Sequence, residues 1–173
     1  MTEDTQYNHD LEFEEYEKKK NKNKEKEKEK EQEVILKTHE RINEGLCGDI
    51  IKHEFGYVEL KLITTNEMIA DDVGLIHGGF IFSAADYAAM AAINERNVVL
   101  VASDCQFLSP VKYHDEVNFI AKVRHNEGRK RNVRVEGFVV DVKVFEGEFK
   151  TVITDRHVLK LHLLDGEEEE NKR

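Results

Sequence analysis

The chain has 173 residues, enough for one domain with a sizeable core, and 36 acidic against 26 basic side chains give it a formal net charge of −10. Residues 1–33 and 165–173 together hold seven of the ten excess negative charges, so the chain between them is nearly neutral and general affinity for nucleic acid is not expected. The sequence shows no apolar run long enough to cross a membrane and no signal-peptide pattern, and Cys47 and Cys105 have no metal-ligand spacing, so we expect a cytoplasmic protein without a bound metal.

The two ends of the chain differ in composition from its middle. Residues 14–33 (EEYEKKKNKNKEKEKEKEQE) contain one side chain suited to a core, Tyr16, and their opposite charges at i,i+3 are offset by like charges at i,i+4. We therefore expect a charged tail over residues 1–33 that is disordered or partly helical, a folded domain over residues 34–164, and an acidic tail over residues 165–173. A role for the N-terminal tail in binding a protein partner is the alternative to a purely solvated tail.

The folded domain begins with a segment whose apolar spacing indicates a short amphipathic helix over residues 34–46 (VILKTHERINEGL). Residues 55–63 (FGYVELKLI) alternate between apolar and polar side chains, which predicts a half-buried strand. A polar loop over residues 64–74 then leads to the most informative stretch of the sequence.

That stretch, residues 74–93 (GLIHGGFIFSAADYAAMAAI), predicts a buried, Ala-rich helix preceded by His77-Gly78-Gly79. Glycines directly before a helix let a ligand approach the backbone, and the first N–H groups of the helix can stabilise an anion or a developing oxyanion. Asp86 lies seven residues after Gly79, about two turns, and returns to the same face, where a desolvated carboxylate suits a general base or a nucleophile. The alternative is that the glycines are ordinary helix punctuation and that Asp86 faces solvent or caps a neighbouring group.

Four further strands are predicted after the helix. They cover residues 98–108, 117–125, 131–142 and 148–161; the first ends at Ser109-Pro110, and hairpins at residues 126–130 and 145–147 join the last three. The first hairpin gathers basic side chains that could hold a phosphate-bearing ligand or could simply be solvated: Arg124, Arg129, Lys130, Arg131 and Arg134.

The motif HGGFIFSAAD, residues 77–86, resembles the signature of hotdog-fold acyl-CoA thioesterases, in particular the phenylacetyl-CoA thioesterase-like branch, and the similarity extends over residues 57–161. It implies an α+β hotdog fold, in which an antiparallel β-sheet wraps around one long central α-helix, and a homodimer, with association into a tetramer left open. By the same resemblance Gly78 supplies the N–H that polarises the thioester carbonyl, and His77 shapes the turn. Asp86 of the other protomer would activate water or attack directly.

The resemblance also implies which residues bind the substrate: Gly79, Phe80, Phe82, Ser83 and Asp71, with Tyr87 and Met90 adding to an apolar tunnel for the acyl chain. The coenzyme A nucleotide would lie near Arg129, Lys130 and Arg131. Two positions depart from the family pattern. Asp71 stands where several relatives have an Asn that orders the water, and Leu100 stands where a Ser or Thr is usual, with Ser103 or Asp104 nearby. These departures leave room for binding without turnover.

We therefore expect a protein that binds acyl-CoA thioesters at a dimer interface and hydrolyses them, with coenzyme A as part of the substrate, no covalently bound cofactor and no metal. The alternative is a non-catalytic acyl-CoA sensor, similar to the effector domain of the hotdog regulator of bacterial lipid synthesis. That regulator has a helix-turn-helix module, which residues 1–33 do not contain, so sensing would act through protein contacts. A hydroxyacyl dehydratase on the same fold is not favoured, because its proline-rich His loop and helix Glu are missing.

Overall fold

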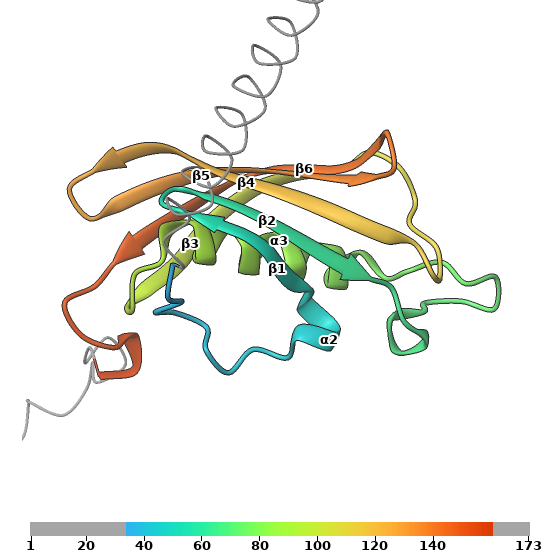
Figure 1. Cartoon of the computed structure of the whole chain (residues 1–173), viewed down its shortest axis with the longest axis horizontal. Coiled ribbons are helices and arrows are strands. Elements are labelled where there is room, and N and C mark those ends of the chain that lie inside the picture. Colours follow the sequence, from blue (N-terminus) through green and yellow to red (C-terminus); the bar gives the residue numbers. More distant parts are fainter. Residues whose placement is uncertain (1–33, 161–173) are drawn as a thin grey trace, which may run out of the picture. The chain divides into compact units, whose positions relative to one another are not determined.

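The computed structural model of the protein describes residues 34–160. Six strands form one antiparallel sheet in the order β1-β2-β4-β5-β6-β3, and the long helix α3 (Gly78–Ile93) lies against one face of it (Figure 1). The strands are β1 (Asp49–Glu54), β2 (Tyr57–Ile63), β3 (Val98–Phe107), β4 (Glu116–Glu127), β5 (Lys130–Val139) and β6 (Val142–Ile153). A short helix, α2 (Glu44–Cys47), precedes β1. The predicted α+β arrangement, an antiparallel sheet around one central helix, is confirmed.

Helix α3 forms the centre of the core because most of its side chains are small or apolar. Ten of its residues are buried: Ile81, Ala84, Ala85, Tyr87, Ala88, Ala89, Met90, Ala91, Ala92 and Ile93. Alanine lets the sheet come close to the helix axis and loses no side-chain entropy on burial. The helix ends at Asn94, which adopts the left-handed conformation (φ 52°) and whose N–H donates to the carbonyl of Met90. The Asn94 side chain also binds the segment before α2, since it accepts from the N–H of Lys37 (2.7 Å) and donates to the carbonyl of Ile35 (2.9 Å).

Aromatic side chains fill the space between the sheet and α3. Phe119 of β4 and Phe145 and Phe149 of β6 are fully buried, and the ring of Phe82 on α3 lies 5.6 Å from that of Phe149. Phe119 and Phe145 meet edge to face at 6.2 Å. Burying one such ring contributes about 1.5–3 kcal/mol. This aromatic layer therefore stabilises the position of α3 on the sheet.

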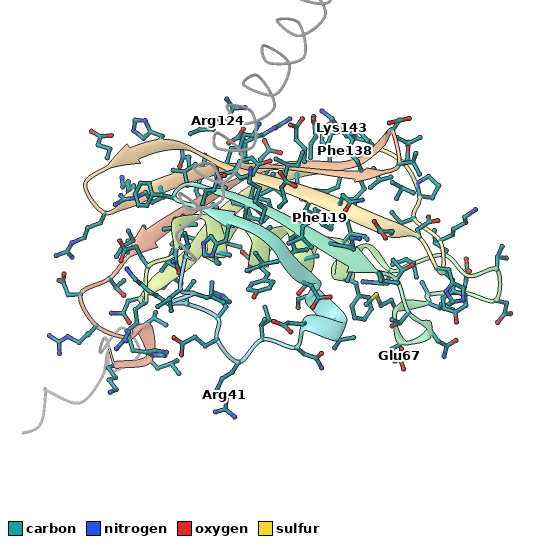
Figure 2. The ribbon with its side chains drawn as sticks, in the orientation of Figure 1. Arg41, Glu67, Phe119, Arg124, Phe138 and Lys143 are labelled. Carbon is teal, nitrogen blue, oxygen red and sulfur yellow. The ribbon has the colours of Figure 1, made fainter. Side chains whose placement is uncertain are left out.

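The opposite face of the sheet carries paired charges. Arg134 lies 2.6 Å from Glu146, and Lys143 contacts both Glu136 and Glu146. Lys143 also lies over the ring of Phe138, and Figure 2 shows both on the side of the sheet away from α3. The sheet therefore has one apolar face, against the helix, and one charged face.

The predicted helix over residues 34–46 is wrong for most of its length. Only Glu44–Cys47 is helical, and the preceding segment is irregular, with His39 at a positive φ of 53°. Strand β1 was not predicted. It pairs with β2 across the turn at residues 55–56, and as an edge strand it has mostly exposed side chains. An edge strand buries too little to impose the apolar alternation by which a strand is found in a sequence.

The predicted turn at residues 145–147 is also wrong, because β6 runs through it and the turn lies at Val140 and Asp141. Gly147 is needed for space and not for a turn: a Cβ on it would lie 3.0 Å from the Cβ of Cys105 and 3.3 Å from the carbonyl oxygen of Asp104, both on the adjacent β3. The real turn has no glycine, although Val140 adopts a positive φ of 53°. A β-branched residue is uncommon in that conformation, so the sequence carried no turn signal there.

The last predicted strand, over residues 148–161, is shorter than expected. It ends at Ile153 as part of β6, and Val158–Lys160 form a 3-10 turn. The two predicted tails, residues 1–33 and 165–173, and the end of the predicted domain lie outside the described residues. No helix within residues 34–160 has the length and apolar character needed to cross a membrane.

Candidate functional site

The first turn of α3 is held by a hydrogen bond between two residues of the His-Gly-Gly motif. The Nδ1 atom of His77, the N-cap residue, accepts from the N–H of Gly79 at 2.9 Å. This bond assigns the ring proton of a neutral His77 to Nε2. A Cβ on Gly79 would lie only 2.8 Å from Nδ1, so a side chain at this position would displace the imidazole. The role predicted for His77, shaping the turn, agrees with this geometry.

Because His77 takes the Gly79 N–H, the N–H of Gly78 is the donor left at this end of the helix. No acceptor for it is found among the described residues. Gly78 also lines a pocket of about 290 Å³, together with Leu75, Ile76, Ile81, Val144 and residues 107–111. A helix N-terminal N–H beside a pocket that is lined mostly by apolar side chains can stabilise negative charge on a bound carbonyl oxygen.

Phe107, the last residue of β3, forms the wall of this pocket next to Gly78. Its ring carbon Cε1 lies 3.1 Å from where a Cβ of Gly78 would stand, so only a glycine lets the ring pack this closely on the helix start. The ring also meets Phe145 edge to face at 5.3 Å. No local sequence pattern indicates this contact, because it depends on the register that places Phe107 opposite Phe145 in the sheet.

Asp86, two turns further along α3, is a desolvated carboxyl group. Its Oδ1 atom is buried and has no hydrogen-bond partner in the described part of the chain. Burial raises the pKa of Asp86 from its ordinary value of 3.8 to about 6. A carboxylate with a pKa close to neutral can take a proton from water and give it back.

Within one chain Asp86 and Gly78 do not meet at the same reaction centre. Eight residues separate them, which is a rise of about 12 Å along the helix. Asp86 is also not among the residues that line the pocket beside Gly78. One chain therefore has both the Gly78 N–H and the Asp86 carboxyl, but they are too far apart to act on the same substrate atom.

The other substrate-binding residues predicted on α3 lie outside the pocket wall of a single chain. Phe82 packs into the core on Phe149, and Phe80 lies edge-on to the ring of His77 at 6.4 Å. The hydroxyl of Ser83 lies 3.2 Å from the thiol of Cys47 on α2, a contact that sequence reasoning missed. These side chains therefore contact neighbouring parts of the same chain and do not line the pocket.

Asp71 holds the loop that leads into α3. Its Oδ1 atom accepts from the N–H groups of Val73 (2.9 Å), Gly74 (3.0 Å) and Leu75 (3.0 Å). These bonds, those to Leu75 and Val73 foremost, lower the pKa of Asp71. An ionised carboxylate suits three N–H donors, which gives a structural reason for an Asp at this position.

The basic hairpin, residues 129–131, lies where β4 joins β5, at the other end of the sheet from the start of α3 (Figure 1). The carbonyl of Arg129 accepts from the N–H of Ile153, and Thr154 is bound to Asn97, beyond the C-terminal end of α3. Arg129 also pairs with Asp155 at 2.7 Å. One chain therefore does not bring these bases together with Gly78.

Comparison with known proteins agrees with this architecture. Residues 73–146 match the family model described as the thioesterase superfamily. The chain is 43% identical to Cj0977, a sigma28-regulated virulence protein from Campylobacter jejuni whose crystal structure superposes with a TM-score of 0.70, and the match covers 72% of this chain and 89% of that one. The chain belongs to the thioesterase superfamily. The predicted hotdog fold is thereby confirmed, and the homodimer stays a prediction.

Three further proteins are similar to the chain. The PaaI protein of the Escherichia coli phenylacetic acid degradation operon is 27% identical, with a TM-score of 0.59, over 63% of this chain and 80% of that one. Among curated proteins, a methylthioribose-1-phosphate isomerase of Aquifex aeolicus is 52% identical over 68% of this chain, and the transcription factor FapR of Thermoanaerobacter is 29% identical over 65%. The chain spans 26% of the length of the first and 57% of the second.

Proposed function

We propose that the protein is an acyl-CoA thioesterase whose active site is shared between two copies of the chain. The observation that carries this proposal is the pair of groups on α3. The N–H of Gly78 has no acceptor among the described residues and lies beside a pocket with mostly apolar side chains, and the carboxyl of Asp86 has a buried Oδ1 atom without a partner in the same part of the chain and a pKa of about 6. The first suits a developing oxyanion and the second suits a general base. Leaving a carboxylate desolvated is costly, and a catalytic role gives that cost a reason.

The exposed edge of the sheet supports the dimer. Within the described residues, β3 has a neighbouring strand on one side only, β6, and its apolar side chains Val101 and Phe107 are 60% and 55% exposed. Antiparallel pairing with the β3 of a second copy would extend the sheet and cover these side chains. It would also reverse the second copy end to end. Asp86 of that copy would approach Gly78 of the first.

The same reversal supports the assignment of the coenzyme A site. In a single chain the basic hairpin and Gly78 lie at opposite ends of the sheet, whereas a two-fold axis at β3 would bring the hairpin of the second copy to the end that carries Gly78. Arg129, Lys130 and Arg131 would then attract the phosphates of coenzyme A, which enters as part of the substrate. No other cofactor and no metal is needed for the reaction that we propose.

The proposed reaction is hydrolysis by an activated water. Ionised Asp86 takes a proton from water, and the water oxygen bonds to the thioester carbonyl carbon while the Gly78 N–H stabilises the charge on the carbonyl oxygen. When the tetrahedral intermediate collapses, the carbon–sulfur bond breaks and Asp86 returns its proton to the leaving sulfur. The products are a carboxylic acid and the free thiol of coenzyme A. Direct attack by Asp86, through an anhydride that water then hydrolyses, is the other form of this step.

The test is release of free thiol from acyl-CoA substrates by wild-type protein and by Asp86→Asn. The variant should lose at least about 100-fold in kcat, because asparagine cannot accept the proton, while substrate binding stays nearly intact. Asp141→Asn, at the exposed turn between β5 and β6, is the matched control and should keep wild-type activity. Equal turnover by wild type and Asp86→Asn would refute the mechanism.

A non-catalytic acyl-CoA sensor is the second candidate. The observation in its favour is the similarity to FapR, a transcription factor, over 114 residues. Binding of acyl-CoA without thiol release by the wild-type protein would support the sensor and contradict the thioesterase.

A further inference from the structure

The pocket beside Gly78 is uncharged on all its described walls. Its lining consists of aliphatic side chains, the ring of Phe107, Pro110 and Gly78 itself, and Ser109 is the one polar side chain among them. A carboxylate that entered this pocket would lose its water and find no cation among these residues. That loss weakens binding by at least about 100-fold relative to an uncharged group of the same size.

The pocket is also small. Its volume of about 290 Å³ lies just below the range of about 300–1,000 Å³ that small-molecule pockets span. A volume of this size limits the length of the acyl chain that fits into the part of the site that one chain provides.

Phe107 limits this volume. Its ring is held between the start of α3, where it touches Gly78, and the ring of Phe145, which is fully buried in the core. The ring is thus fixed on its inner side, and in a single chain the residue is 55% exposed, so truncating it opens the pocket without removing a side chain from the core of that chain. Phe145 cannot be truncated in the same way, because its loss leaves a cavity in the core.

We infer that the pocket beside Gly78 receives an uncharged acyl group of limited size, and that Phe107 determines the largest group that it accepts. This inference rests on the proposed function, because it treats the pocket as the acyl part of the thioester site. It assigns selection against acyl groups with a terminal carboxylate to the uncharged lining that one chain gives this pocket, and selection against long chains to the ring of Phe107.

Equilibrium binding tests the inference independently of turnover. The full-length chain carrying Asp86→Asn, which suppresses hydrolysis during the titration, is titrated with straight-chain acyl-CoAs from acetyl to dodecanoyl and with succinyl- and glutaryl-CoA. Affinity should rise about three- to fourfold per methylene up to a limiting length and then stop rising. Succinyl-CoA should bind at least about 100-fold more weakly than butyryl-CoA, its uncharged match in length.

The role of the Phe107 ring is tested by combining Phe107→Ala with Asp86→Asn in one chain. The limiting length should move to longer chains, with a gain of about tenfold for thioesters two methylenes beyond the original limit. Phe107→Leu should give an intermediate limit. Phe55→Ala is the matched control: Phe55 is 92% exposed in the turn between β1 and β2, far from the pocket in the fold, and its removal should leave the limit unchanged.

The outcomes separate this inference from the proposed function. Equal binding of succinyl- and butyryl-CoA, an unmoved limit in Phe107→Ala, or no binding of any thioester would overturn the inference. If the selectivity is found but the wild-type chain, with Asp86 intact, releases no thiol, the inference stands and hydrolysis does not.

Discussion

Replacing Asp86 with asparagine should make the protein more stable at neutral pH while it removes activity. The Oδ1 atom of Asp86 is buried without a partner among residues 34–160, and the pKa of the carboxyl is raised from 3.8 to about 6. That difference corresponds to at most about 3 kcal/mol of destabilisation of the ionised form, less where part of the carboxyl still contacts water. Asparagine has nearly the same shape and no charge, so Asp86→Asn avoids the destabilisation that the buried negative charge causes.

The difference in stability between Asp86→Asn and wild type should depend on pH. Because the pKa is higher in the folded chain than in the unfolded chain, the unfolded chain releases its proton first as the pH rises. The wild-type protein therefore loses stability between pH 4 and about pH 6.5, and this loss then stays constant at higher pH. The advantage of Asp86→Asn over wild type should grow by about 2–3 kcal/mol across this window.

Urea denaturation at fixed protein concentration, from pH 4 to pH 8, measures this difference. Taking wild type minus variant at each pH cancels the other titrating groups, and Asp141→Asn controls for loss of one carboxylate on the surface. A variant that is equally stable or less stable than wild type at pH 8 would refute the reasoning, since it would mean that Asp86 is paired with a donor or cation in the assembled protein.

The kcat/KM for thioester hydrolysis should rise with pH through a pKa near 6 as Asp86 ionises, which a pH–rate profile measures; a flat profile would exclude Asp86 as the base. Gly79→Ala should displace the His77 ring, lower stability by about 1 kcal/mol and lower kcat/KM at least about tenfold; unchanged kinetics would show that the turn need not be held. Val140→Asn should raise stability by about 1 kcal/mol in a thermal melt, because asparagine tolerates the positive φ at this exposed turn, and no rise would mean the turn is unstrained. Alanine at all three of residues 129–131 should weaken coenzyme A binding several-fold at low salt and less at high salt, and an equal dissociation constant would make the basic hairpin a plain solvated turn.

The central helix and its two candidate groups could be predicted from the sequence because their signals are local. A run of alanines with apolar neighbours indicates a buried helix, His-Gly-Gly marks its start, and one carboxylate inside such a run stands out. The structure adds the hydrogen-bond partners and the distances, which the spacing of residues in a sequence does not show. His77 accepts a hydrogen bond from the Gly79 N–H, so the Gly78 N–H is the one that could bind a ligand. Asp86 lies about 12 Å from Gly78 along the axis of the same helix.

The features that were missed depend on contacts between distant segments. Phe107 reaches Gly78 only because β3 pairs with β6 in one particular register, and no local pattern encodes that register. Gly147 looked like a turn residue but is required for the close approach of β3, while the real turn uses Val140. Asp71 looked like a pocket carboxylate, yet its hydrogen bonds are directed into its own loop.

The most direct test of the shared active site is a mixing experiment with two variants. Asp86→Asn removes the base, and Gly78→Val forces a side chain against the Phe107 ring at the oxyanion donor. Each variant alone should release little thiol from acyl-CoA. Unfolded together and refolded, they should recover about a quarter of wild-type activity, because half of the dimers are then mixed and each mixed dimer holds one intact site. A mixture that forms mixed dimers and stays inactive, or a wild-type protein that releases no thiol, would contradict the account.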